Sequence, residues 1–327
     1  MSLPALRAIR ERFPVAEIVV LARPWVTDLY ARERFVDRVI LYTAAKGARD
    51  WGGKWRLARH LRRERFDCAI LLQNAFDAAL IAWMAGIPRR IGYNRDGRGL
   101  LLTGAVNVPR AGEIERHESY YYLELLRRAG LIETVPKVEA IRLDGAAEAG
   151  RKGMERLEQA GFPGAVVGVS PGAAFGSAKQ WFPERFAAAA VRVAREIGPA
   201  VALFGSGGER ELCERVSERI AAEGVMVKNF AGETSLGEFV ELAAACRVFL
   251  TNDSGAMHIA SALGVPTVAV FGATDHLATG PTGERSRVVR EPVDCAPCKL
   301  RECPIDHRCM ERVPARRVAD VALELLK

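Results

Sequence analysis

The stretch NDSGAMH, residues 252–258, holds the residues with the clearest chemistry, and it lies where an apolar strand pattern ends and a helical pattern begins. The unpaired backbone N–H groups and the dipole of a helix start attract anions, so a diphosphate would fit there. Ser254 and His258 are four residues apart on one helical face, and Gly255 allows close approach to the backbone. Asp253 is either a plain helix cap or an acceptor for ribose hydroxyls.

A second loop, PGAAFGSAKQW at residues 171–181, follows another apolar strand pattern and carries Lys179 near its end. Transfer of a sugar from a nucleotide leaves a diphosphate, and a fixed cation near developing negative charge is a large catalytic contribution. Lys179 is therefore the candidate catalytic residue, the alternative being an ordinary surface lysine. Neither loop matches a Walker A sequence or a G-x-G-x-x-G fingerprint, which argues against a kinase or a dehydrogenase.

Four cysteines, Cys295, Cys298, Cys303 and Cys309, follow the spacing C-x2-C-x4-C-x5-C, with His307 inside it. Thiols stay reduced in the cytoplasm, so these residues form either a structural zinc site or a loop of free cysteines. The spacing is shorter than that of common zinc ribbons. An iron–sulfur cluster fits less well.

The elements that would position these loops alternate in the C-terminal half of the chain. Five apolar segments, at 165–170, 200–205, 226–231, 248–252 and 267–272, are separated by amphipathic patterns typical of helices. This order predicts a doubly wound parallel sheet, and such sheets bind ligands at the carboxyl ends of their strands. Both loops above lie at strand ends.

The N-terminal half repeats this alternation less regularly, with strands expected near 17–22, 38–42, 67–72 and 89–92. It reads as a second α/β domain. The boundary is expected near residue 160, giving domains 1–160 and 161–327, the second closed by a helix at 314–327. The chain opens on a helical segment, LPALRAIRERF, whereas doubly wound domains usually begin with a central strand, so a strand is expected ahead of Met1.

Charge is distributed unevenly over the 327 residues. Residues 1–142 hold 25 Lys+Arg and 16 Asp+Glu, a net of +9, and the remainder nets −2. A basic surface favours a nucleic acid, a phosphorylated glycolipid or an anionic membrane. No motif of interleaved basic and aromatic residues supports a nucleic-acid partner. No apolar run could cross a bilayer, and the first residues do not read as a secretory signal, so a cytoplasmic protein is expected.

PGAAFGSAKQW, LFGSGGE, FAGETSL, TNDSGAMHIASALGVP and VAVFGATD, in this order, resemble the ADP-heptose:lipopolysaccharide heptosyltransferases, particularly the heptosyltransferase II type. The resemblance implies a GT-B architecture, two Rossmann-like domains with an active site between them. It also implies an inverting glycosyltransferase that needs no metal, with ADP-L-glycero-D-manno-heptose as donor and the lipopolysaccharide inner core as acceptor. A peripheral position on the inner membrane is an accompanying expectation.

By this resemblance, Lys179 would contact phosphate, and Asp253, Ser254, Gly255 and His258 would match the family's nucleotide-binding stretch. Thr234 would contact the nucleotide as well. Two further assignments rest on the same basis or on position. Asn74 and Arg95 are acceptor-side residues, and the cysteine segment is one that family members often carry.

Family members begin with a strand and a loop whose Gly-Asp pair supplies the proposed base, and that segment is expected ahead of Met1. No residue of this sequence is assigned as the base. Two alternatives therefore stay open: a related glycosyltransferase with another donor or acceptor, and an inactive protein that binds sugar nucleotides.

Overall fold

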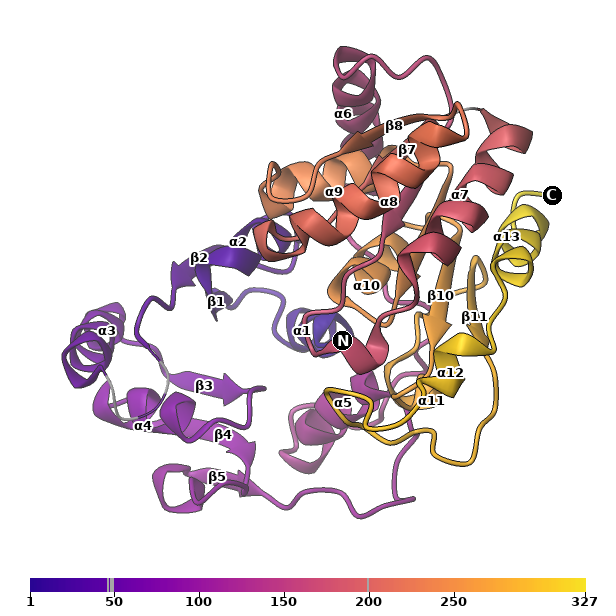
Figure 1. Ribbon diagram of the computed structural model, residues 1–327. Helices are drawn as coiled ribbons and strands as arrows, with labels where there is room; N and C mark the ends of the chain where they lie inside the picture. The colour runs from indigo at the N-terminus through magenta and orange to yellow at the C-terminus, as the bar shows by residue number, and fades with distance from the viewer. Residues whose placement is uncertain (46, 48–49, 199) are drawn as a thin grey trace. The chain divides into compact units, whose positions relative to one another are not determined.

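The computed structural model describes residues 1–45, 47, 50–198 and 200–327, which form two compact units (Figure 1). Unit 1 comprises Met1–Val138 and unit 2 comprises Glu139–Lys327. The division falls earlier than the boundary expected near residue 160. Among the helices of the described residues, none is long and apolar enough to cross a membrane.

Unit 2 is built on a six-stranded, wholly parallel sheet with the strand order β11-β10-β9-β6-β7-β8. Successive connections run outward from β6 in one direction and from β9 in the other, so the order reverses between these two neighbours. This confirms the predicted doubly wound sheet. The strands are β6 (Val166–Ser170), β7 (Ala200–Leu203), β8 (Met226–Asn229), β9 (Val248–Asn252), β10 (Thr267–Phe271) and β11 (Ser286–Arg290).

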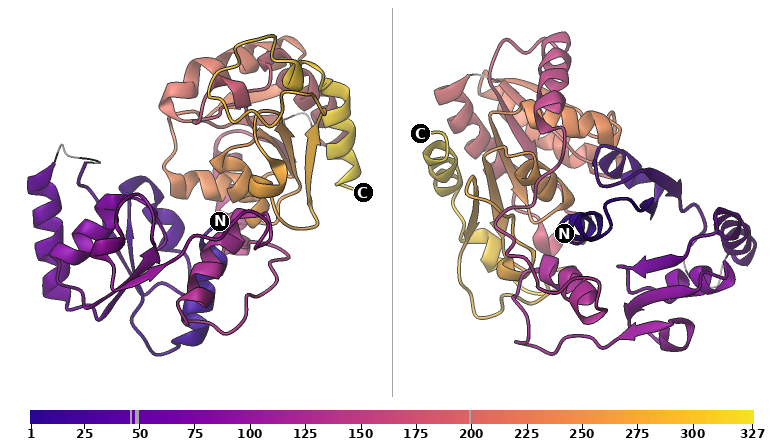
Figure 2. Two further views of the ribbon diagram at one scale, coloured as in Figure 1. Left: turned by 90° about the horizontal axis from the view of Figure 1, so that it is seen from below. Right: turned by 180° about the vertical axis from the view of Figure 1, so that it is seen from behind.

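Helices cover both faces of this sheet, because its strands are apolar on both sides (Figure 2). On β7, Val201 and Leu203 belong to one buried cluster and Ala200 and Ala202 to another. The helices and turns of unit 2 are α6 (Ala146–Gln159), η4 (Ser177–Lys179), α7 (Pro183–Ile197), η5 (Gly207–Glu209), α8 (Arg210–Ala222), α9 (Leu236–Ala245), α10 (Gly255–Ala262), α11 (His276–Thr279), α12 (Arg308–Glu311) and α13 (Ala315–Glu324).

Helix α6 explains why the boundary lies before residue 160. It packs closely on α9, and a Cβ atom at Gly153 would collide with the backbone carbonyl of Glu241. The Arg156 Nε also donates to Glu241 Oε2 at 2.7 Å. Residues 146–159, which the expected boundary placed in the first domain, are thus an integral helix of unit 2.

Unit 1 contains two separate parallel sheets in its described residues, where the sequence indicated one domain of the same kind. Strands β1 and β2 form one sheet, and β3, β4 and β5 form the other. The elements are α1 (Leu3–Arg12), β1 (Val19–Ala22), η1 (Pro24–Val26), α2 (Thr27–Tyr30), β2 (Arg38–Leu41), α3 (Trp51–Glu64), β3 (Cys68–Leu71), α4 (Phe76–Met84), β4 (Arg89–Tyr93), η3 (Gly99–Leu101), β5 (Gly104–Val106) and α5 (Glu118–Arg128).

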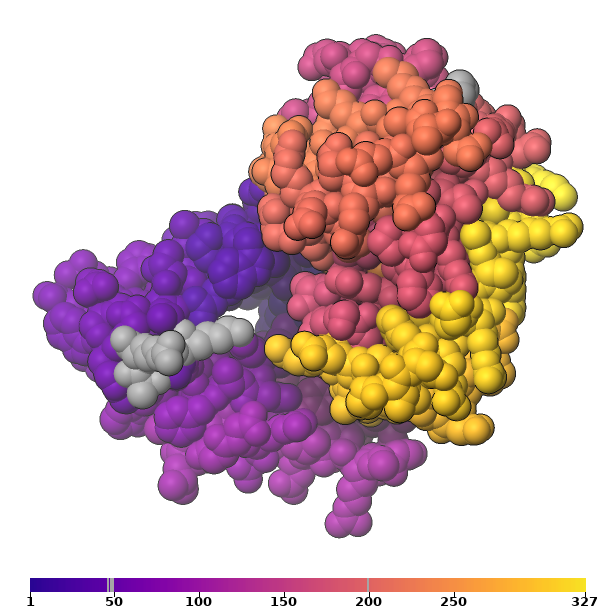
Figure 3. Space-filling model, viewed as in Figure 1, coloured from indigo at the N-terminus to yellow at the C-terminus, as the bar shows by residue number. Residues whose placement is uncertain are grey.

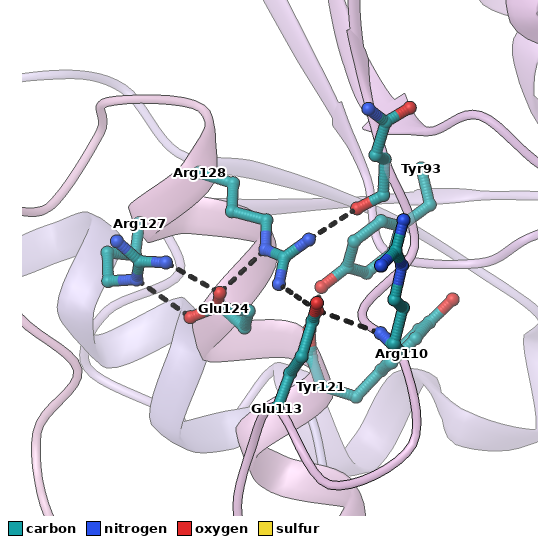
Figure 4. Close-up of polar contacts among 8 residues, drawn as sticks. Tyr93, Arg110, Glu113, Tyr121, Glu124, Arg127 and Arg128 are labelled. Carbon is teal, nitrogen blue, oxygen red and sulfur yellow. Dashed lines mark hydrogen bonds and ion pairs between the residues drawn. The ribbon is translucent and has the colours of Figure 1, made fainter.

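An ion-pair network anchors α5 within unit 1 (Figure 4). The carboxylate of Glu124 accepts hydrogen bonds from Arg127 at 2.7 and 2.8 Å and from Arg128 at 2.6 Å. Arg128 also reaches Glu113 at 2.7 Å and the backbone carbonyl of Asn107 at 3.2 Å. The segment that leaves β5 is thereby attached to the helix that follows it.

Candidate functional site

The candidate site of unit 2 lies where the strand order reverses, at the carboxyl ends of β6 and β9. In doubly wound sheets the loops diverge at this point and leave a crevice that binds ligands. Lys179 comes from the loop after β6, and Asp253 follows β9 directly. The Lys179 Nζ lies 2.6 Å from Asp253 Oδ2, so the structure brings together two residues that the sequence nominated separately.

Asp253 is nearly buried and is held from two sides. Besides Lys179, the hydroxyl of Thr274 donates to the same Oδ2 atom at 2.6 Å. An ammonium group has three N–H donors, and Asp253 occupies one of the three on Lys179. The carboxylate therefore orients the lysine and leaves donors for a further anionic group. Thr274, which follows β10, was not nominated from the sequence.

Asn252 fixes both ends of the lysine loop. Its Nδ2 donates to the Pro171 carbonyl at 2.7 Å, and its Oδ1 accepts from the Trp181 backbone N–H at 3.0 Å. Asn252 and Trp181 are both fully buried. Because one buried amide bridges the start and the end of the loop, the path of the backbone around Lys179 is set by unit 2 itself.

Helix α10 begins at this crevice with Ser254 as its N-cap residue. The Ser254 hydroxyl is 3.2 Å from the Thr251 hydroxyl, and the space beside Gly255 is open, since a Cβ there would meet no atom within 4 Å. His258 follows on the first turn. Ser254, and not Asp253, occupies the N-cap position, so the cap interpretation of Asp253 does not hold. Asp253 pairs with Lys179 instead, and its contact with ribose hydroxyls stays a prediction.

Thr234 lies in the loop between β8 and α9, immediately before Ser235, the N-cap residue of α9. This loop contacts the loop after β7, since the Gly232 N–H donates to the Gly205 carbonyl at 3.0 Å. In the strand order, β8 is two positions from β6. Thr234 is thus on the same edge of the sheet as Lys179, farther from the point where the order reverses.

The cysteine-bearing segment packs against the lysine loop. The Ala178 N–H donates to the Arg301 carbonyl at 2.9 Å, and His307 Nε2 is 3.1 Å from the Ala178 carbonyl oxygen. Gly176 has φ of +156°, and a Cβ there would collide with the Arg301 carbonyl. The segment therefore supports the loop by contacts to the backbone of Gly176 and Ala178, which no sequence motif predicted.

Two cationic side chains lie near the aromatic ring of Phe175 at this site. Lys179 Nζ is 4.9 Å from the centre of its ring, and the Arg301 guanidinium is 5.5 Å from the same centre. Cations are attracted to the face of an aromatic ring. The structure thus adds Arg301 to the positive groups near the crevice, a residue 122 positions from Lys179 in the sequence.

The four clustered cysteines are reduced, and Cys309 is buried. Burial raises the pKa of the Cys309 thiol, and the nearby thiols of the other three raise it further. Within the parts of the chain that the structure describes, no three His, Cys, Asp or Glu side chains are arranged to hold a metal ion. The arrangement does not fit a bound ion as it stands, so the structural zinc stays a prediction.

In unit 1, the two acceptor-side candidates have different surroundings. Asn74 donates to the Tyr121 hydroxyl at 2.9 Å and accepts from Arg98 at 3.2 Å. Arg95 is exposed and lies 3.6 Å from Asp96. The structure places Asn74 in a network with Arg98, a residue that was not nominated from the sequence, and leaves Arg95 at the surface.

Arg98 is fully buried, and its guanidinium donates to the backbone carbonyls of Tyr93, at 2.9 Å, and of Gln73. Burial lowers the pKa of this guanidinium. Its donors are directed at the segment that carries Asn74. We therefore read Arg98 as a residue that positions the 73–74 turn.

Comparison with known proteins gives consistent matches. The family model "Glycosyltransferase family 9 (heptosyltransferase)" matches residues 54–308. Lipopolysaccharide heptosyltransferase 2 of Salmonella typhimurium is 33% identical over 298 residues, 89% of this chain and 84% of that protein. The structure of ADP-heptose lps heptosyltransferase II of E. coli superposes with a TM-score of 0.80 and 28% identity, covering 99% of this chain and 94% of that one.

A second solved structure, a glycosyl transferase family 9 protein from Veillonella parvula, gives a TM-score of 0.83 at 22% identity, with 99% of this chain and 92% of that chain covered. At that identity the match concerns the fold alone. Together the superpositions confirm the predicted α/β fold of GT-B type.

Proposed function

The chain belongs to glycosyltransferase family 9, the heptosyltransferase family, and we propose that it transfers heptose to the inner core of lipopolysaccharide in the manner of heptosyltransferase II. The proposed donor is ADP-L-glycero-D-manno-heptose. Family and enzyme class agree with the prediction made from the sequence motifs. The donor, the acceptor and the stereochemistry are parts of the proposal.

The observation that carries the proposal is the Lys179–Asp253 pair at the reversal point of the sheet. A diphosphate placed there would meet the remaining N–H donors of Lys179 and the first turn of α10, whose N-terminus favours negative charge. Ser254, Gly255 and His258 line that turn, and Thr234 stands on the same sheet edge as a contact for the rest of the nucleotide.

In the proposed reaction, an acceptor hydroxyl loses its proton to a base, and its oxygen forms a bond to the anomeric carbon of the heptose. The bond between that carbon and the diphosphate oxygen breaks, and ADP leaves with the bonding electrons, so the configuration inverts. Lys179 would stabilise the charge that develops on the leaving diphosphate. The chemistry requires no metal, and we assign the base to no residue of this chain.

The acceptor would be bound by unit 1, whose basic excess suits a phosphorylated, acidic oligosaccharide. Asn74 is the acceptor-side residue with the better support, because Arg98 and Tyr121 fix its amide. Arg95, which is exposed, would attract the acidic acceptor at long range. Since the acceptor is a glycolipid, we place the protein in the cytoplasm, against the inner face of the inner membrane.

The test is a transfer assay with ADP-L-glycero-D-manno-heptose and a deacylated inner-core acceptor, read by mass spectrometry. The proposal expects a product heavier than the acceptor by one heptosyl residue, with inverted configuration at the new linkage by NMR. Calorimetric titration with other nucleotide sugars is the companion measurement. Binding of another donor but not of ADP-heptose would overturn the proposed donor, and donor binding without turnover would favour a binding protein.

A further inference from the structure

Helix α3 presents an unusual combination of exposed tryptophan and arginine. Trp51 and Trp55 are 57% and 54% exposed, although tryptophan is normally well covered in folded proteins. Residues 51–65 carry five exposed arginines and one Glu, while the sixth basic residue, Lys54, is buried and pairs with Asp77. A surface of this composition differs from an ordinary solvated helix face, which would mix both signs of charge and avoid large aromatic rings.

These side chains share one face of the helix. Trp51, Trp55 and Arg59 follow at intervals of four residues, which places them one above the other. The buried residues of α3, which are Lys54, Ala58 and Leu61, lie on a neighbouring side of the helix, about 90° around its axis from this row. Glu64 is turned away as well and pairs with Arg38 at 2.8 Å. The exposed face is therefore aromatic and positive, with no acidic residue along it.

The arginines of this face are available to an external partner. Arg59 lies over the ring of Trp55, with its guanidinium 5.3 Å from the ring centre. Within the described residues neither Arg59 nor Arg63 has an acidic partner. Between α3 and α4 the surface is hollowed, with a volume of about 300 Å³. The hollow is lined by Trp55, Ala58, Arg59, Arg62, Arg63 and Met84.

Helix α3 lies at the outer edge of unit 1, with α4 on its inner side, as the views in Figures 1 and 2 agree. Figure 3 draws unit 1 in space-filling form from the same side as Figure 1. The side chains of Trp51, Trp55, Arg59 and Arg63 are exposed, so a partner can contact them without displacing any described element of unit 1.

We propose that this face of α3 docks on an anionic phospholipid surface, with Trp51 and Trp55 in the interfacial layer and Arg59 and Arg63 on lipid phosphates. Tryptophan partitions to the boundary between headgroups and acyl chains, and basic side chains near an anionic leaflet each add attraction. The hollow between α3 and α4 would accept a headgroup phosphate. The inference deepens the proposed function, since it names the surface by which the protein reaches a glycolipid acceptor.

Co-sedimentation with vesicles tests the proposal, comparing phosphatidylcholine alone with a mixture that contains about 30 mol% phosphatidylglycerol. The unmodified protein is expected to sediment with the anionic vesicles and to dissociate as salt is raised. Arg59→Glu/Arg63→Glu is expected to weaken binding about tenfold or more. The matched control, Arg215→Glu/Arg219→Glu on exposed positions of α8, makes the same charge change and should bind like the unmodified protein.

A second pair of variants tests the contribution of the tryptophans to vesicle binding. Trp55→Ala is expected to reduce binding and the blue shift of tryptophan emission on anionic vesicles, whereas Trp25→Ala, which removes an equally exposed ring outside α3, should do neither. Thermal unfolding checks that each variant is folded. If the double variant does not fold, the salt dependence of vesicle binding by the unmodified protein tests the role of the arginines instead. Equal loss in the α3 and α8 variants, or no binding to anionic vesicles, would overturn the proposal.

Two further readouts separate the explanations. If the same arginines bind a single-stranded RNA oligonucleotide and not vesicles, the surface serves nucleic acid and the lipid proposal is wrong. Transfer to a water-soluble, deacylated acceptor should be unchanged in Arg59→Glu/Arg63→Glu, because that substrate does not need a bilayer. Vesicle binding without any transfer would overturn the proposed function and leave the docking surface intact.

Discussion

Each unit holds a cation in its interior, and the two are held differently. Lys179 in unit 2 pairs with a carboxylate and keeps 13% of its side chain exposed. Arg98 in unit 1 is wholly buried and donates to backbone carbonyls and to Asn74. A cation with donors left over at a crevice can act on a ligand, whereas one whose donors are consumed by the chain can only shape it. Burial alone therefore does not mark a reactive residue.

The substitution Lys179→Ala tests the difference between Lys179 and Arg98 most directly. Removal of a charge that stabilises a leaving group costs on the order of 10² to 10³ in turnover. We expect transfer to fall by about that factor while the unfolding free energy changes by only about 1–2 kcal/mol, since Thr274 still donates to Asp253. Steady-state transfer kinetics and urea denaturation measure the two effects.

Lys152→Ala is the matched control, because Lys152 is an exposed lysine of unit 2 paired with Glu148. It should leave both quantities near those of the unmodified protein. Turnover of Lys179→Ala within threefold of the parent would show that the lysine is as structural as Arg98.

The opposite result is expected for Arg98→Met. The variant leaves the carbonyls of Tyr93 and Gln73 without their buried donor, which should destabilise unit 1 by about 3 kcal/mol. Donor affinity, measured by calorimetry, should stay the same because the donor is assigned to unit 2. Arg95→Met, at an exposed position, should change stability by less than about 0.5 kcal/mol. If Arg98→Met unfolds like the parent, the positioning role is wrong.

The ion pairs of Glu124 make a contribution to stability that depends on pH, because one carboxylate is shared by two arginines. Its hydrogen bonds to Arg127, and then to Arg128, lower the pKa from 4.5 to about 2. A lowered pKa means that the stabilisation is complete above about pH 4.5 and is lost as the pH falls toward 2. Glu124→Gln should therefore destabilise the protein by about 2 kcal/mol at neutral pH, and the difference should shrink below pH 4.5.

Chemical denaturation across this pH range, with the exposed Glu115→Gln as control, measures the effect. A constant difference between Glu124→Gln and the parent from neutral pH down to acid would contradict the role of the ionised pair. Figure 4 shows why a loss is expected: the same carboxylate connects both arginines of the last turn of α5.

The sequence was informative wherever a residue's role follows from its own neighbours. Lys179 and Asp253 each follow a strand, and parallel strand ends meet at one sheet edge, so their proximity could be anticipated. Strands β6, β7, β9 and β10 of unit 2 could be predicted because each is a largely apolar run and is buried along its length. Strand β11, in which Ser286 is half-buried and Arg287 is exposed, gave no such signal.

The roles of residues that contact distant parts of the chain could not be predicted from the sequence. Asn252 closes a loop about 80 residues away, and Arg98 supports a turn about 25 residues away, both through backbone carbonyls that no residue type identifies. The division at residue 138 could not be predicted either, because only the contact with α9 assigns α6 to unit 2. The separation of unit 1 into two sheets depends on which strands pair with each other, and the composition of the strands does not determine this.

The smallest effect is expected for Arg301. Like Lys179, Arg301 is a cation beside the ring of Phe175, and its guanidinium is exposed to a ligand. Its carbonyl supports Ala178 whatever the side chain, so Arg301→Ala removes only the cation. An exposed cation near a diphosphate contributes about 0.5–1 kcal/mol. We therefore expect the KM for the donor to rise about three- to fivefold with kcat unchanged, and the increase to fade as salt screens the parent's charge. Arg316→Ala, equally exposed but on α13, should leave KM unchanged. A fall in kcat with constant KM would mean that Arg301 acts on the leaving diphosphate in the transition state rather than on binding, and would place it beside Lys179 in the reaction itself.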